Sequence, residues 1–215
     1  MDSIYFTEEH QALREQVARF VENEVRPNGR AWEAAGFVPR DILRKMGELG
    51  LFGIRYPSRY GGSELGQLST VILAEELGKS GFGGFSATVL VHTDMASPHI
   101  AHFGNTAQLD KYMSKVVSGE MITAVGVTEP DAGSDVAALR TTARRNGDGW
   151  VLNGSKMFIT NGVHGDLFFV AARTDPEAKG SRGISMFIVE KGTPGFEVAR
   201  PLEKFGWLCS DTTEL

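Results

Sequence analysis

The sequence VGVTEPDAGSD at residues 125–135 lies where the chain changes from one kind of structure to another. It begins as a β-strand, which Pro130 breaks, and continues as a tight loop that contains Gly133. Such a loop can turn backbone N–H groups and the hydroxyls of Thr128 and Ser134 towards a ligand rich in acceptors. The alternative is a surface turn whose two aspartates bond to their own backbone. The residues leave both interpretations open.

Downstream of this stretch the pattern is that of β-structure. Asn146–Gly149 separates two short runs of β-forming residues and predicts a tight hairpin, because Asn and Gly tolerate a positive φ. Further strands are predicted at residues 157–159, 167–172, 184–189 and 196–202.

Upstream, residues 7–117 have the apolar spacing of helices. The first helix should begin after Thr7 and end at Pro27, and Pro39 should open the second. Three more are expected near residues 68–77, 87–103 and 106–117, the last capped by Thr106. With no alternation of strand and helix, the order predicts an α+β multidomain fold. It consists of an all-α domain at 1–119 and an antiparallel, β-barrel-like domain at 120–215.

Composition excludes several classes of protein. The 215 residues carry 22 Lys+Arg and 27 Asp+Glu, a net charge of −5, without the basic patch of a nucleic-acid surface. No apolar run approaches the ~18 residues that span a bilayer. The single cysteine, Cys209, cannot form an intrachain disulfide. These features predict a cytoplasmic protein, or one from an organelle matrix.

A second stretch, NGSKMFITNG at residues 153–162, places Phe158 two residues before Thr160. In a strand both side chains would point to one side, where the ring could lie beside a flat cofactor and the hydroxyl could donate to its edge. Alternating core residues are the other explanation.

Together, VTEPDAGSD, the hairpin, LNGSKMFITNG, GISMFIVEKGTPGF and KFGWLCSDTTEL resemble the acyl-CoA dehydrogenase family, in the order of its first two domains. Phe158, where many members carry Trp, is similar to long-chain and branched-chain types. The resemblance implies bound FAD and oxidation of an acyl-CoA to the trans-2-enoyl-CoA. It also implies electron transfer to an electron-transfer flavoprotein and a homotetramer or homodimer.

The resemblance also implies which residues form the site. Thr128 should lie near the pyrimidine edge of the flavin, Phe158 against its rings and Thr160 near its reactive N5, while Ser134 should lie close to the substrate thioester. The residues expected to line the flavin are Val125, Gly126, Val127, Thr128, Gly133, Ser134, Phe158, Ile159 and Thr160.

No catalytic residue is assigned in this chain. In the family the base that removes the α-proton lies in a third, helical-bundle domain, which is expected beyond Leu215; Glu129 belongs to the loop motif and is not assigned as the base. An acyl-CoA oxidase or flavin monooxygenase on the same fold, and a non-catalytic remnant that binds acyl-CoA or a partner, remain open. No metal site is expected, because His92, His99 and His102 lack an acidic partner at ligand spacing.

Overall fold

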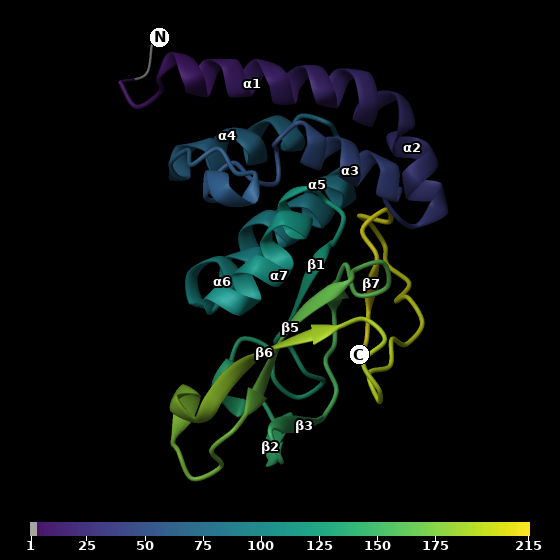
Figure 1. Cartoon of the computed structure of the whole chain (residues 1–215). Coiled ribbons are helices and arrows are strands. Elements are labelled where there is room, and N and C mark those ends of the chain that lie inside the picture. The colour runs from purple at the N-terminus through teal and green to yellow at the C-terminus, as the bar shows by residue number, and fades with distance from the viewer. Residues whose placement is uncertain (1–3) are drawn as a thin grey trace. The chain divides into compact units, whose positions relative to one another are not determined.

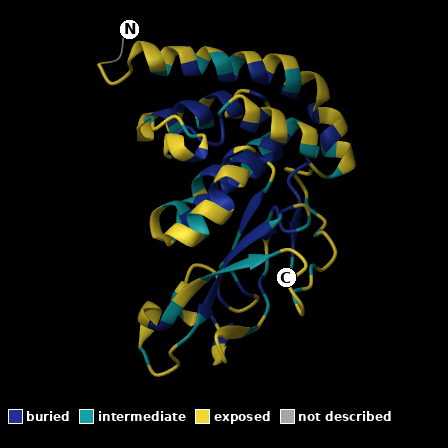
Figure 2. Ribbon diagram, in the orientation of Figure 1, coloured by how far each residue is buried: buried dark blue, intermediate teal, exposed yellow. Residues whose placement is uncertain are grey.

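The computed structural model describes residues 4–215, which divide into two compact units. The helical unit comprises residues 1–122 and 204–210, and the sheet unit comprises residues 123–203 and 211–215. Figure 1 labels the helices and strands, and Figure 2 colours the same ribbon by burial. An N-terminal helical region followed by a sheet region confirms the predicted order of fold classes. None of the helices within 4–215 is both long and apolar enough to cross a membrane.

The helical unit consists of short helices joined by tight turns. Its elements are α1 (Glu8–Phe20), π-helical η1 (Val21–Val25), α2 (Arg26–Ala35), α3 (Arg40–Glu48), 3₁₀ turn η2 (Ser58–Tyr60), α4 (Gln67–Gly78), α5 (Gly83–Leu90), π-helical η3 (Val91–Ala96), α6 (Ser97–Phe103) and α7 (Thr106–Val117).

The prediction that the first helix ends at Pro27 is wrong. The π-helical η1 continues α1 into α2, and Pro27 lies in the first turn of α2, where a missing N–H is tolerated. The helix ends instead at Gly36, whose φ of 81° is left-handed. The predicted cap of α7 is also wrong by one residue. Asn105 and Gln108 bond to each other's backbone N–H, each at 2.9 Å, as a capping box.

Buried aromatic and aliphatic side chains from several helices hold the helical unit together. The Phe85 ring centroid lies 5.6 Å from that of Trp32 and 6.4 Å from that of Phe20. Arg14 of α1 forms ion pairs with exposed Glu75 and buried Glu76 of α4, at 2.8 and 2.5 Å.

Residues 204–210 belong to the helical unit although they follow most of the sheet. The Glu33 carboxylate of α2 accepts the backbone N–H groups of Leu208 at 2.8 Å and Cys209 at 3.3 Å. Burial and the neighbouring Glu33 raise the pKa of the fully buried Cys209 thiol to about 12. Lys204 donates to the carbonyl oxygens of Trp207 and Ser210, which closes the segment on itself.

The sheet unit contains a five-stranded mixed sheet in the order β1-β5-β2-β3, with β6 paired to β5, and a separate two-stranded sheet. The strands are β1 (Thr123–Gly126), β2 (Thr142–Asn146), β3 (Gly149–Asn153), β4 (Ile159–Thr160), β5 (Leu167–Arg173), β6 (Ile184–Glu190) and β7 (Thr212–Thr213), with 3₁₀ turns at η4 (Val136–Ala138) and η5 (Gly180–Gly183).

The expectation of an antiparallel, barrel-like domain requires correction. The central strand β5 runs parallel to β1 and, through Arg173, to the first residue of β2, Thr142; it runs antiparallel to β6. Residues 127–166 between β1 and β5 form a long crossover, which permits parallel pairing. Within residues 4–215 the sheet is open and does not close into a barrel. The strand predicted at 196–202 is also absent; only an isolated bridge joins Pro201 to Thr213.

Candidate functional site

The sheet unit brings the two motif stretches into direct contact. The Met157 N–H donates to the Thr128 carbonyl oxygen at 2.8 Å. The Lys156 ammonium donates to the Val127 carbonyl oxygen at 3.1 Å. The backbone of Lys156 also exchanges two hydrogen bonds of 2.8 Å with Leu215. Residues separated by nearly thirty positions in the sequence therefore form one structural element.

At the centre of this element lies a buried ion pair that the sequence analysis missed. The Lys156 Nζ lies 2.7 Å from Glu129 Oε1, and the two side chains are only 3% and 5% exposed. The backbone N–H groups of Arg140 and Thr141 donate to the same carboxylate at 2.5 and 2.9 Å. No local pattern indicates this pair, because its partners are 27 residues apart.

The hydrogen bonds determine the charge state of Glu129. Burial raises the pKa of its carboxyl, but the bonds from the Arg140 N–H, from Lys156 and from Thr141 together lower that pKa to about 2. Burial lowers the pKa of the Lys156 ammonium, and Glu129 partly offsets that effect. Because the carboxylate is a very weak base and already accepts three donors, it is a structural ion.

The loop after Glu129 is closed by main-chain bonds. The Glu129 N–H donates to the Ala132 carbonyl at 2.8 Å, and the Ala132 N–H donates back at 3.2 Å. Asp131 forms an exposed ion pair with Arg140 at 3.0 Å instead of bonding to its own backbone. Gly133 and Ser134 are exposed. A Cβ on Gly133 would meet no atom within 4 Å, so the fold itself does not require glycine there.

Phe158 does not lie in a strand, so the predicted two-residue alternation with Thr160 is wrong. Its φ of 61° is left-handed, and its side chain is 63% exposed. The strand begins one residue later: Ile159 is buried in the core with Ala124 and Phe168, and half-buried Thr160 pairs with Thr212. The alternation of a strand therefore does not apply to the ring of Phe158 and the hydroxyl of Thr160.

Unpaired donors accompany this exposed ring in the sheet unit. Within residues 4–215 the backbone N–H and the hydroxyl of Thr128 have no hydrogen-bond partner, and the residue is half-buried. Val125 and Gly126 belong to β1 and pair with Phe169 and Val170 of β5. An aromatic face with free donors suits a flat ligand with acceptor atoms on its edge.

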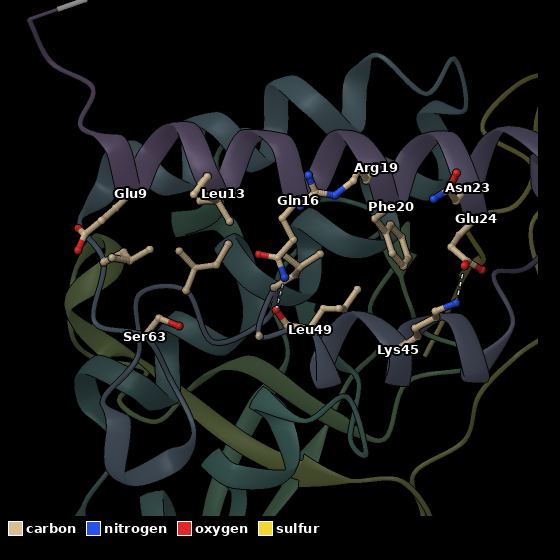
Figure 3. Close-up of a pocket in the computed structure, with 15 residues that line it drawn as sticks. Glu9, Leu13, Gln16, Arg19, Phe20, Asn23, Glu24, Lys45, Leu49 and Ser63 are labelled. Carbon is tan, nitrogen blue, oxygen red and sulfur yellow. Dashed lines mark hydrogen bonds and ion pairs between the residues drawn. The ribbon is translucent and has the colours of Figure 1, made fainter.

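The helical unit has a groove and the sheet unit has a pocket. A groove of about 790 Å³ on the helical unit lies between α1 and the segment 45–65, with apolar Leu13 and Phe20 in its lining (Figure 3). Gln16 crosses it to the Leu49 carbonyl at 2.9 Å, and Lys45 pairs with Glu24 at its edge (Figure 3). None of the predicted site residues lines this groove. A pocket of about 540 Å³ in the sheet unit is lined by Thr141, Lys156, Phe196 and other residues.

The three histidines considered as metal ligands, His92, His99 and His102, lie in the helical unit. Burial lowers the pKa of the His92 imidazole to about 4, and its Nε2 lies 3.1 Å from the Val116 carbonyl oxygen. The ring centroids of His92 and Phe52 lie 4.5 Å apart in an edge-to-face arrangement. No group of three or more potential metal ligands occurs in the described part of the chain. The high pKa of Cys209 makes that thiol a poor nucleophile.

Comparison with known proteins identifies the family to which the chain belongs. The family models described as "Acyl-CoA dehydrogenase, N-terminal domain" and "Acyl-CoA dehydrogenase, middle domain" match residues 7–120 and 124–215. The mouse long-chain specific acyl-CoA dehydrogenase is 42% identical over 98% of the chain and 49% of its own length. The crystal structure of acyl-CoA dehydrogenase from Geobacillus kaustophilus is 43% identical, with a TM-score of 0.94 over 99% of this chain and 56% of that one.

A glutaryl-CoA dehydrogenase from Mycobacterium smegmatis, solved in complex with FADH2, is 32% identical. It has a TM-score of 0.89 and is matched over 97% of this chain and 52% of that one. The chain spans about half the length of the curated relatives it matches. The two family models together account for nearly all of its residues, and the chain belongs to the acyl-CoA dehydrogenase family.

Proposed function

We propose that this chain supplies the flavin-binding and thioester-binding segments of an FAD-dependent acyl-CoA dehydrogenase. The observation that carries the proposal is the direct contact between its two motif stretches. The Lys156 ammonium donates to the Val127 carbonyl oxygen, and the Met157 N–H donates to the Thr128 carbonyl oxygen. The exposed ring of Phe158 and the free donors of Thr128 fit the flat, acceptor-edged ring system of a flavin. When bound, FAD accepts the substrate's β-hydrogen as a hydride.

The roles of the individual residues follow from that assignment. Thr128 would donate to the pyrimidine edge, Phe158 would cover the ring system and Thr160 would donate near N5. Val125, Gly126, Val127, Gly133 and the backbone of Ile159 would line the flavin, because the Ile159 side chain is used in the core. Exposed Ser134 would hydrogen-bond to the acyl-CoA near its thioester.

The base is not expected among these residues. Glu129 is the motif's carboxylate, but its three donors and its pKa of about 2 exclude proton abstraction near neutral pH. We propose that the base belongs to the part of the relatives that this chain does not match, since the chain spans about half their length. An electron-transfer flavoprotein as electron acceptor, a homotetramer or homodimer, and location in the cytoplasm or an organelle matrix complete the proposal.

The proposal is tested by titrating the purified chain with FAD and following flavin fluorescence. Saturable quenching is expected in the wild type, and it should weaken about tenfold in Phe158→Ala because the covering ring is lost. An exposed apolar residue of the helical unit offers the matched control: Phe103→Ala should bind FAD like the wild type. Absence of saturable binding would refute the flavin assignment.

Anaerobic mixing of the FAD-loaded chain with acyl-CoAs of several lengths tests the position of the base. The flavin absorbance should persist, because Glu129, the carboxylate of the motif, is held as a structural ion and is too weak a base to remove the α-proton. Bleaching at a rate typical of enzymes would locate the base within residues 1–215. Fast reoxidation by oxygen after chemical reduction would favour an oxidase or a monooxygenase over a dehydrogenase.

A further inference from the structure

The buried ion pair lies directly behind the peptide group that carries the free donor. Lys156 Nζ contacts the Val127 carbonyl oxygen at 3.1 Å, and Thr128 N–H belongs to the same peptide unit. We propose that Lys156 and Glu129 are positioning residues that tune the electron affinity of a flavin bound at Thr128, acting through the Val127 carbonyl. This inference rests on the proposed function, since it takes Thr128 as a flavin contact.

The geometry of a trans peptide makes this route direct. The carbonyl and the N–H of one peptide unit point in opposite directions, so an ammonium at the Val127 oxygen leaves the Thr128 N–H free on the far side. The described peptide bonds of this chain are all trans. A charged donor polarises the carbonyl, and hydrogen bonds in series strengthen one another in a low-dielectric interior. The Thr128 N–H is therefore a stronger donor than an ordinary amide.

Glu129 provides the second half of the arrangement. A lone ammonium that is only 3% exposed would pay a large desolvation cost, and the carboxylate at 2.7 Å offsets it. The same carboxylate holds the N–H groups of Arg140 and Thr141, so it also fixes the loop that follows Thr128. Of the two charged groups, the Lys156 ammonium is the one that hydrogen-bonds to the Val127 oxygen, so the positive member of the pair lies closer to the donor peptide.

The sign of the charge separates this role from simple structural support. Reduction adds negative charge to the flavin, and a stronger donor at its edge favours the reduced form. Removing the positive charge should lower the reduction potential of the flavin, and removing the negative charge should raise it. Loss of structural support has no reason to follow the sign of the deleted charge.

The experiment compares Lys156→Met, Lys156→Arg and Glu129→Gln in the FAD-loaded chain, with potentials measured by dye equilibration. Lys156→Met should lower the ratio of reduced to oxidised flavin at fixed potential about three- to tenfold, which is roughly 15 to 30 mV for a two-electron couple. Lys156→Arg keeps the charge and should restore most of the wild-type value. Glu129→Gln should shift the potential in the opposite direction. If Glu129→Gln fails to fold, the contrast between Met and Arg at position 156 decides.

A flavin-free measurement gives an independent readout. In the chain without FAD, the NMR carbonyl carbon shift of Val127 should move upfield in Lys156→Met and stay close to wild type in Lys156→Arg, because a hydrogen bond deshields the carbonyl. Equal potentials in Lys156→Met and the wild type, or equal changes in the Met and Arg variants, would overturn the inference while leaving the proposed function intact. Failure of the wild type to bind FAD would refute the proposed function itself.

Discussion

Phe158 combines an exposed aromatic ring with a backbone conformation that bulky residues avoid, with a φ of 61°. A left-handed conformation costs roughly 1–2 kcal/mol for a residue with a Cβ, so the surrounding bonds must impose it. Such strain is common at functional sites. At the residue scale, the conformation supports a role for this ring in binding.

Phe158→Gly should therefore separate stability from binding. Relief of the left-handed strain, less the backbone entropy of glycine, should raise the free energy of unfolding by up to about 1 kcal/mol. FAD affinity should fall about tenfold with the loss of the ring. Chemical denaturation and flavin titration measure the two quantities.

Trp207 provides the control for that variant. It has a φ of 55° and is also 63% exposed, but it belongs to the helical unit, which contains none of the proposed flavin residues. Trp207→Gly should leave FAD binding unchanged. A Phe158→Gly chain that binds FAD like the wild type would show that this strain has no part in flavin binding.

At the scale of elements, Gly47 marks a close approach inside the helical unit. It lies in α3, and a Cβ there would come within 2.1 Å of the Ser118 carbonyl oxygen, just after α7. Gly47→Ala should therefore force the backbones apart and lower the free energy of unfolding by about 1–3 kcal/mol. Urea denaturation measures the loss.

Gly78 in α4 is the matched control, because its added Cβ would meet nothing within 4 Å. Gly78→Ala should leave stability unchanged or raise it by up to about 1 kcal/mol. Equal stabilities for the two alanine variants would contradict the close approach at Gly47.

Elements defined by local patterns were predictable from the sequence, and pairings between distant segments were not. The hairpin around Asn146–Gly149 and the helix at 106–117 have signals within a few residues of themselves. The parallel pairing of β1 with β5 joins segments about forty residues apart. The return of residues 204–210 to the helical unit depends on Glu33, far away in the sequence.

The same distinction applies to the candidate site. The motif stretches could be recognised from their residues, and the structure joins them through Met157 and Thr128. The ion pair that holds them could not be recognised, because a lysine and a glutamate 27 residues apart form no pattern. The backbone conformation of Phe158 was mispredicted, because a single left-handed residue breaks the two-residue period of a strand.

At the scale of the whole molecule, the two units should respond to acid in different pH ranges. His92 in the helical unit has a folded pKa of about 4 against an ordinary value of 6.5, because burial excludes the charged ring; nearby Arg40 opposes the charge as well. Glu129 in the sheet unit has a folded pKa of about 2 against 4.5, because its hydrogen bonds favour the carboxylate over the effect of burial.

Both shifts make the protein less stable as pH falls. The unfolded state binds the proton on His92 more readily, so its contribution is complete above pH 6.5 and is lost between pH 6.5 and 4. The contribution of Glu129 is complete above pH 4.5 and is lost between pH 4.5 and 2. Each loss amounts to about 3 kcal/mol at about 1.4 kcal/mol per pH unit. The helical unit should weaken first.

Hydrogen exchange followed by mass spectrometry measures the order in which the two units lose stability as pH falls. Between pH 6.5 and 4, exchange rates corrected for intrinsic pH dependence should rise in peptides from α5 and η3 before they rise in peptides from β5. The His92→Gln variant keeps a donor for the Val116 carbonyl and cannot be protonated in this range. It should therefore weaken the pH dependence of the exchange rates in the helical unit alone. If both units instead weaken at the same pH, and the His92→Gln variant behaves in the same way, then neither His92 nor Glu129 controls the acid response.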